Sequence, residues 1–181
     1  MTRILGLTIL FITLSALAHA DSALTPRPPH EVVQFQRNLP LVEALIDSGV
    51  RLVEEEDALV RAEACAAVAR RFVSEIELAA EQDDALRTVE LGRRLHDLLR
   101  YGVAENLRSA RRRIPQGSTG ELRWQQVNRL ALDLMKPFHE SLVRAGTVED
   151  RQEFRALVDD LLRRQQALEK LLHLATPMGV Q

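Results

Sequence analysis

The residues best suited to binding chemistry are four arginines within six positions: Arg108, Arg111, Arg112 and Arg113. The planar guanidinium group pairs readily with carboxylates and phosphates, so the cluster predicts contact with an anion or an acidic protein partner. A structural interpretation is favoured over this one. Cations stabilise the carboxyl end of a helix, and Pro115 and Gly117 are residues that typically follow such an end. The loop has no GxxxxGK pattern, so a nucleotide phosphate site is not predicted.

Three histidines, His96, His139 and His173, fall on three different predicted helices. Helical proteins can bind metals with such residues, and the sequence does not exclude that the three converge. However, the chain lacks the H-E-x-x-H, E-x-x-H and C-x-x-C-H spacings that place ligands together. Each histidine is therefore expected to make a local hydrogen bond at the edge of an apolar face, and no metal ion or other cofactor is predicted.

The pattern of nucleophiles and acids does not indicate an enzyme. The serines lie within predicted helices, without a G-x-S-x-G turn, and the acidic run at 54–57 reads as a solvated helix junction. Cys65, the only cysteine, lies between Ala58 and Phe72 on an apolar row that repeats every seven residues. It is expected to be a buried small side chain rather than a reactive thiol. We predict a non-catalytic protein, with an unrecognised enzyme as the third hypothesis.

The amino terminus reads as an export signal. The run MTRILGLTILFITLSALAHA has an early Arg3, an apolar stretch over 4–17, and Ala18 and Ala20 at the −3 and −1 positions of a cleavage site after Ala20. The protein is expected in the bacterial periplasm or outside the cell. An uncleaved anchor is the alternative, although the apolar stretch is shorter than the roughly 20 residues of a typical span.

The remaining chain is predicted to be one domain with nearly balanced charge. Residues 21–30 are expected to be a flexible Pro-rich spacer, 31–175 a helical domain and 176–181 a frayed tail. The whole chain has 24 basic and 26 acidic residues. Such a balance predicts neither nucleic acid nor an anionic membrane as the partner, and no membrane span is expected after cleavage of the signal.

Apolar residues recur at spacings of three and four, which predicts helices throughout and no strand. A short helix over 40–55 has its apolar positions at Val42, Leu45, Ile46, Val50 and Val53. Four long helices are expected over 58–80, 85–114, 121–145 and 147–174, the second carrying ion pairs such as Arg93 with Asp97. The apolar row of the first is Leu59, Ala62, Ala66, Ala69, Val73, Ile76 and Ala80, with Ala58, Cys65, Phe72 and Ala79 beside it; that of the third is Trp124, Val127, Ala131, Leu134, Phe138, Leu142 and Ala145; and that of the fourth is Phe154, Leu157, Val158, Leu161, Leu168, Leu171 and Leu172. Asp83 or Asp84 can cap the second helix, and Ser118 or Thr119 the third. Pro137 should kink or break the third, and Thr147 with Asp150 should form a capping box for the fourth. Gln165 interrupts the apolar row of the last helix. It is expected to lie at the edge of that row or to be a buried group that makes a hydrogen bond.

The predicted fold is all-α: an antiparallel, up-and-down bundle of four long helices plus a shorter N-terminal helix. The first functional hypothesis is an exported interaction or scaffold module that contacts a protein partner through Arg108, Arg111, Arg112 and Arg113. The alternative is a bundle that binds a metal ion or a small ligand near Pro137. Self-association through the alanine-rich seam of 59–80 is also plausible from the sequence.

Overall fold

The computed structural model describes residues 55–175, with side chains through His173, and before them only Gln36, Leu39, 41–43, 45, 46, 49 and 52. The chain divides into two units, Met1–Leu39 and Pro40–Gln181, and the helices α3 to α8 all belong to the second. The predicted signal peptide with Ala18 and Ala20, the spacer and the tail all lie outside the described residues.

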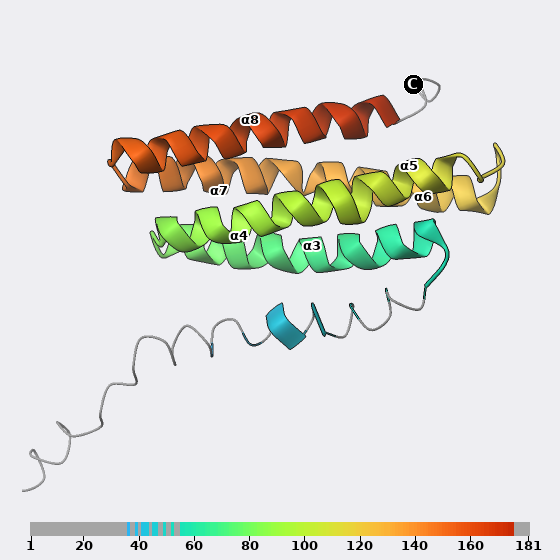
Figure 1. Ribbon diagram of the computed structural model, residues 1–181, viewed down its shortest axis with the longest axis horizontal. Helices are drawn as coiled ribbons and strands as arrows, with labels where there is room; N and C mark the ends of the chain where they lie inside the picture. Colours follow the sequence, from blue (N-terminus) through green and yellow to red (C-terminus); the bar gives the residue numbers. More distant parts are fainter. Residues whose placement is uncertain are drawn as a thin grey trace, which may run out of the picture. The chain divides into compact units, whose positions relative to one another are not determined.

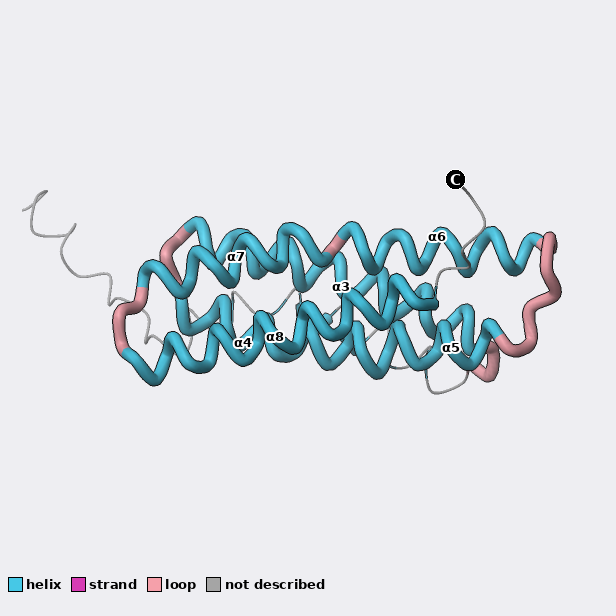
Figure 2. The backbone as a smooth tube through the Cα atoms, turned by 90° about the horizontal axis from the view of Figure 1, so that it is seen from above, coloured by secondary structure: helices cyan, strands magenta, loops and turns pink. Residues whose placement is uncertain are grey.

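All secondary structure among the described residues is helical, which confirms the all-α prediction (Figure 1). Four long stretches lie side by side in both views of the backbone (Figures 1 and 2). They are α3 (Ala58–Glu81); α4 (Ala85–Asp97) continuing through η2 (Leu98–Ala104) into α5 (Glu105–Arg111); α6 (Thr119–Asp133) followed by α7 (Met135–Val148); and α8 (Gln152–Ala175).

Helix α3 buries the alanine-rich seam that its sequence predicts. The Asp57 carboxylate accepts a hydrogen bond of 2.8 Å from the Leu59 amide and so caps the helix. Both predicted rows are buried: Leu59, Ala62, Ala66, Ala69, Val73, Ile76 and Ala80, and beside them Ala58, Cys65, Phe72 and Ala79. Because this seam is used within the chain, it does not offer a free surface for a second copy.

The chain reverses between α3 and α4 at a short junction. Asp83 has a positive φ of 56°, and Asp84 caps α4 by accepting from the Arg87 amide at 3.2 Å. Capping by one of these two aspartates is therefore confirmed. Arg87 pairs with Glu75 at 3.1 Å, and farther along the two helices Arg61 donates to the Asn106 side chain at 3.0 Å. The opposite order of these partners shows that the two stretches run in opposite directions.

The second long stretch contains a π-helical segment, η2, where the sequence predicts a regular helix. Its innermost residues, Leu95, Leu99, Val103 and Leu107, follow one another at steps of four and are all nearly inaccessible to solvent. In a regular α-helix, a row of this spacing drifts by about 40° at each step. The wider turn of a π-helix offsets that drift and keeps the row facing the core. The alternation of three and four that indicates a regular α-helix does not predict such a segment.

The third stretch is interrupted where Pro137 predicts a kink or break. Helix α6 ends at Asp133, Leu134 forms a turn, and α7 begins at Met135. Pro137 has no amide hydrogen to offer the Asp133 carbonyl, so the regular hydrogen-bond ladder cannot continue through this point. At the start of α6, Ser118 provides the expected cap and accepts from the Glu121 amide at 3.3 Å.

The predicted capping box at 147–150 is wrong. Helix α7 continues to Val148, and the Thr147 hydroxyl donates to the Arg144 carbonyl at 2.7 Å instead of capping the next helix. Helix α8 begins only at Gln152, and Asp150 pairs with Arg155. Thr147 and Asp150 have the spacing of a capping box. The Thr147 hydroxyl is instead used within α7, where it donates to a carbonyl of the preceding turn.

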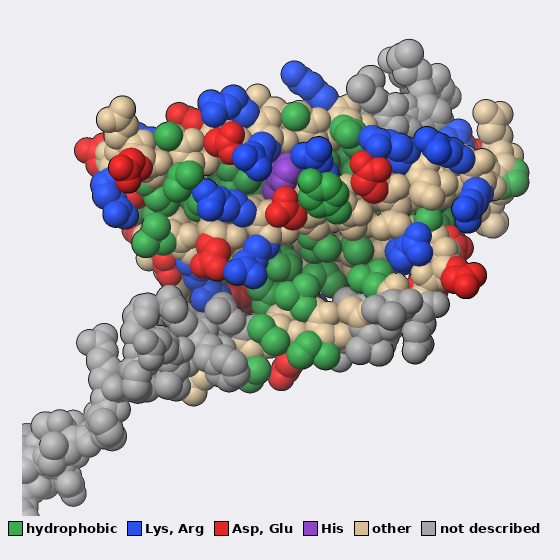
Figure 3. Space-filling model, viewed as in Figure 1, with side chains coloured by type: hydrophobic (Ala, Val, Ile, Leu, Met, Phe, Trp, Pro, Cys, Tyr) green, Lys and Arg blue, Asp and Glu red, His purple; other side chains and the backbone are tan. Residues whose placement is uncertain are grey.

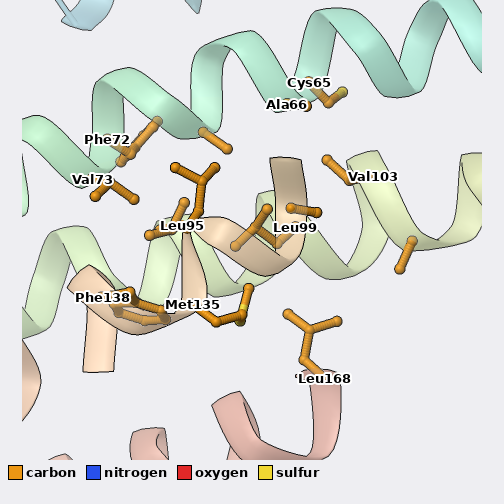
Figure 4. Close-up of a cluster of buried hydrophobic side chains, with 14 of the residues drawn as sticks. Cys65, Ala66, Phe72, Val73, Leu95, Leu99, Val103, Met135, Phe138 and Leu168 are labelled. Atoms are coloured by element: carbon orange, nitrogen blue, oxygen red, sulfur yellow. The ribbon is translucent and has the colours of Figure 1, made fainter. Parts of the chain in front are cut away.

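Side chains from every long stretch meet in one hydrophobic core. Figure 4 shows Phe72 and Val73 of α3, Leu95 and Leu99, and Phe138 of α7 directed toward one another. Four predicted apolar positions are exposed in the structure: Leu157 and, in the predicted short helix over 40–55, Val42, Leu45 and Ile46. Leu41 is buried instead. Val50 and Val53 lie outside the described residues. Spacing identifies a helical face, but it does not show which face has a neighbour to cover it.

Candidate functional site

A groove of about 740 Å³ opens between α5 and the last turns of α8, and we call it the basic groove. Its apolar lining comes from Ala104, Leu107, Trp124, Ala167, Leu171 and Leu172, and its charged lining from Arg108, Arg111, Arg112 and Lys170. Lys and Arg side chains gather on this face where α5 lies beside α8 (Figure 3). Among the described residues, four cations and no carboxylate therefore line an otherwise apolar hollow.

The indole of Trp124 forms a fixed part of the groove. Its Nε1–H donates a buried hydrogen bond of 2.8 Å to the Leu107 carbonyl, and the side chain is almost completely inaccessible. The Arg111 guanidinium lies over the ring at 5.7 Å from its centroid, a distance suited to a cation–π contact. Arg111 also pairs with Glu121 of α6 at 3.2 Å. These contacts join α5 to α6 and orient the ring.

The four cations of the basic groove differ in their availability. Arg111 is engaged as described, and Arg108 donates to both carboxylate oxygens of Glu105 at 2.9 Å. Arg112 and Lys170 are exposed and have no ion pair within the part of the chain that the structure describes. Positive charge at the groove is thus only partly neutralised by neighbouring carboxylates.

The structure separates the four arginines that the sequence singled out. Arg108, Arg111 and Arg112 line the basic groove, whereas Arg113 lines another hollow with Asp57, Ile114 and Arg123. The helix-end interpretation also fits, because α5 ends at Arg111 and Arg112 is its C-cap residue. Lys170 was missed: it lies far from the cluster in sequence, and only the packing of α8 beside α5 brings it to the groove.

The three histidines make separate local contacts. His96 Nδ1 lies 3.3 Å from Asp97 Oδ1, His139 Nδ1 lies 3.0 Å from Gln165 Oε1, and His173 Nε2 lies 3.8 Å from Glu169 Oε1. No group of three or more potential metal ligands occurs among the described residues. The convergence that the sequence left open is therefore not seen in this part of the chain.

A smaller polar hollow of about 300 Å³ surrounds the buried His96 between α4 and α8. Arg93 and Asp97 line it from one side, and Asp160 and Arg164, which pair at 2.7 Å, from the other. The predicted pairing of Arg93 with Asp97 is not formed, because Asp97 contacts His96 instead. Two arginines face two aspartates here, so this hollow has little preference for either sign of ligand charge.

The region around Pro137 is filled by side chains rather than opened. Leu134, Met135 and Phe138 are buried, and the Gln165 amide of α8 donates to the Met135 carbonyl at 2.7 Å. Of the two roles predicted for Gln165, the structure therefore shows that of a buried group that makes a hydrogen bond. The inner face of this break is thus lined by packed apolar side chains and by the amide of Gln165.

Cys65 is buried, as its position on the apolar row predicts. Burial raises the pKa of the thiol above its ordinary value, and the nearby positive charge of Arg61 opposes this shift only in part. A thiol that stays protonated and covered is a poor nucleophile. The Cys65 environment therefore has the character of core packing.

Within the described residues, none of the helices combines the length and the hydropathy needed to cross a lipid bilayer. Comparison of the chain with protein-family models, with curated proteins and with solved structures found no match.

Proposed function

We propose that this chain is an exported, non-catalytic binding module and that the basic groove is its contact site. Export is supported by the amino-terminal sequence, with its apolar stretch and the small residues Ala18 and Ala20 before the cleavage point. The periplasm or the cell exterior is then the compartment where the module acts.

The proposed scaffold is an antiparallel, up-and-down bundle with a shorter N-terminal helix. The order of paired residues supports this arrangement. Across α5 and α6, Leu107 pairs with Trp124 and Arg111 with Glu121. Across α6–α7 and α8, Asn128 donates to the Leu172 carbonyl and Gln165 to the Met135 carbonyl. In each case, higher numbers on one stretch meet lower numbers on the other.

One observation carries the functional proposal: in the described part of the chain, an apolar hollow is lined by four cations and by no carboxylate. Such a surface favours a partner that combines an apolar body with negative charge. The contact set suggested by the sequence is accordingly revised. Arg108, Arg111 and Arg112 stay in it, Lys170 is added, and Arg113 is left out because it lines a different hollow.

The absence of catalysis remains part of the proposal. The ionisable groups that line the basic groove are arginines and a lysine, which suit the binding of an anion. General acid–base catalysis near neutral pH usually depends on histidine or on a carboxylate of shifted pKa. A binding role is therefore the simplest function for the groove, and an enzyme stays the weaker hypothesis.

Capture of partners from the extracytoplasmic fraction of the source cells tests the proposal. The informative variant is Arg112→Glu with Lys170→Glu, because neither side chain has an ion pair in the described structure, so charge reversal breaks none there. The matched control is Arg70→Glu with Arg71→Glu, an equal change of charge on the exposed side of α3.

We expect the groove variant to lose a partner that the original chain and the control variant both retain, with unchanged helical circular dichroism. Equal recovery of all partners by the two variants would remove the basic groove as the contact site. Elemental analysis of the natively purified protein tests the metal-binding alternative separately, and a stoichiometric metal would revive it.

A further inference from the structure

We infer that the basic groove binds a single-chain amphiphilic anion, with an aliphatic chain on the apolar lining and an anionic head group at Arg112 and Lys170. The inference rests on the proposed function, because it assigns the chemical class of the ligand to the same site. Long-chain carboxylates, alkyl phosphates and alkyl sulfates share this chemistry.

The size of the groove favours a small ligand over a macromolecule. Its volume of about 740 Å³ lies within the range of about 300–1,000 Å³ found for small-molecule sites. Among the described side chains of α8, the lining extends from Ala167 to Leu172, which is about 7.5 Å of helix. A partner helix that anchors positions i to i+7 would extend over roughly 10 Å, so it would project beyond this wall.

The apolar lining is formed before any ligand arrives. Leu107 and Trp124 are buried, and the hydrogen bond between them holds the indole in one orientation. Leu172 is also buried, and Leu171 is partly covered. Ala167 is exposed and Leu171 only partly covered, so an aliphatic chain placed against these two side chains would remove apolar area from water. No rearrangement of the core beneath them would be required, which lowers the cost of binding.

The charged groups suggest where the head group lies. Arg108 is paired with Glu105, and Arg111 is held between Glu121 and the Trp124 ring. Arg112 and Lys170 are the two lining cations without an ion pair in the described residues, and they come from opposite walls, α5 and α8. An anion between these walls would gain charge-assisted hydrogen bonds without breaking an existing ion pair.

Trp124 makes the inference directly measurable, because it is the only tryptophan in the chain and it lines the groove. The experiment titrates the mature protein with 9,10-dibromostearate below its micellar concentration and follows Trp124 fluorescence. Bromine atoms quench indole emission at short range. We expect saturable quenching that unbrominated stearate reverses by competition.

Two further ligand series test the chemistry. A dibrominated alcohol of the same chain length should bind about tenfold or more weakly, because it lacks the charge that Arg112 and Lys170 recognise. Unbrominated dodecyl phosphate and dodecyl sulfate distinguish the possible head groups by how well they displace dibromostearate. Displacement by none of the anions, or equal binding of the alcohol, overturns the inference.

The variants locate the site. Arg112→Glu with Lys170→Glu should weaken dibromostearate binding by about tenfold or more, whereas Arg70→Glu with Arg71→Glu should leave it unchanged. Arg112→Gln with Lys170→Gln serves the same purpose if charge reversal impairs folding, which unliganded Trp124 emission and thermal unfolding would reveal. Equal affinity in the groove and control variants overturns the assignment.

Failure of this inference is distinguishable from failure of the proposed function. If dibromostearate does not quench Trp124 but partner capture still depends on Arg112 and Lys170, the amphiphilic ligand is excluded and the groove is a macromolecular contact site. If quenching depends on these residues but partner capture does not, the ligand assignment stands and the macromolecular partner is removed.

Discussion

The indole nitrogen of Trp124 donates a hydrogen bond of 2.8 Å to the carbonyl of Leu107, and both side chains are buried. The bond joins α6 to α5 at the inner end of the basic groove. The buried indole nitrogen thereby has a hydrogen-bond partner at the place where the core meets the protein surface. The apolar part of the groove is consequently a continuation of the packed interior and not a loop that could rearrange easily.

Trp124→Phe should lower the free energy of unfolding by about 1–3 kcal/mol, because it removes the buried donor and part of the ring that contacts Arg111. Urea denaturation followed by circular dichroism measures the change. Tyr101→Phe is the matched control, since the Tyr101 ring is exposed and the effect should stay within about 0.5 kcal/mol. Equal midpoints for both variants would contradict a structural role of the Trp124–Leu107 bond.

Gln165→Leu should destabilise the protein by about 1–3 kcal/mol. The amide is buried, donates to the Met135 carbonyl at 2.7 Å and lies 3.0 Å from His139 Nδ1, so leucine would leave these groups without their partner. The neighbouring Gln166 is exposed, and Gln166→Leu should change stability by less than about 0.5 kcal/mol. Chemical denaturation of the two variants shows whether the loss of stability depends on burial of the glutamine or only on the change of residue type.

Gly102→Ala should be destabilising because the new Cβ would lie 2.8 Å from the Cys65 sulfur. Overpacking of this kind typically costs about 1–3 kcal/mol. In the double variant with Cys65→Ala the sulfur is gone, so the penalty of Gly102→Ala should be much smaller in that background. A double-mutant cycle of unfolding free energies measures the coupling, and strictly additive effects would show that the two residues do not collide.

Stability should decline in alkaline solution in a way that depends on Cys65. Burial raises the pKa of the folded thiol, so the folded state keeps its proton where the unfolded thiol, with a pKa of about 8.5, already loses it. The stabilising contribution is therefore complete below that value and is lost as pH rises toward the folded pKa. Unfolding curves from pH 7 to 10 should show this component in the original chain and not in Cys65→Ala.

The apolar spacing in the sequence predicted much of the core. Every predicted inward position of α3 is buried, and so are the seven of α6 and α7: Trp124, Val127, Ala131, Leu134, Phe138, Leu142 and Ala145. Local rules also identified helix caps at Asp84 and Ser118 and the interruption near Pro137. These features depend on residues within a few positions of one another, which is the range over which helix chemistry acts.

Predictions from short stretches of sequence were wrong where the same residues could form more than one local structure. Thr147 and Asp150 have the spacing of a capping box, yet α7 extends through Thr147 and α8 starts later. Leu157 has the spacing of the core but is exposed. The π segment η2 keeps Leu99 and Val103 facing inward. Its cause is the packing of that row against other helices, which no short window of sequence contains.

The sequence by itself determined that the chain is helical and which faces of its long helices are apolar, and it predicted a group of four arginines, Arg108, Arg111, Arg112 and Arg113, near one helix end. Only the tertiary structure decided that Arg113 leaves this group, that Lys170 joins it and that Trp124 supplies the apolar surface between them. The reason is physical. Helix formation and amphipathicity follow from neighbours along the chain, whereas a groove forms between elements distant in sequence whose relative placement is fixed by packing the whole core.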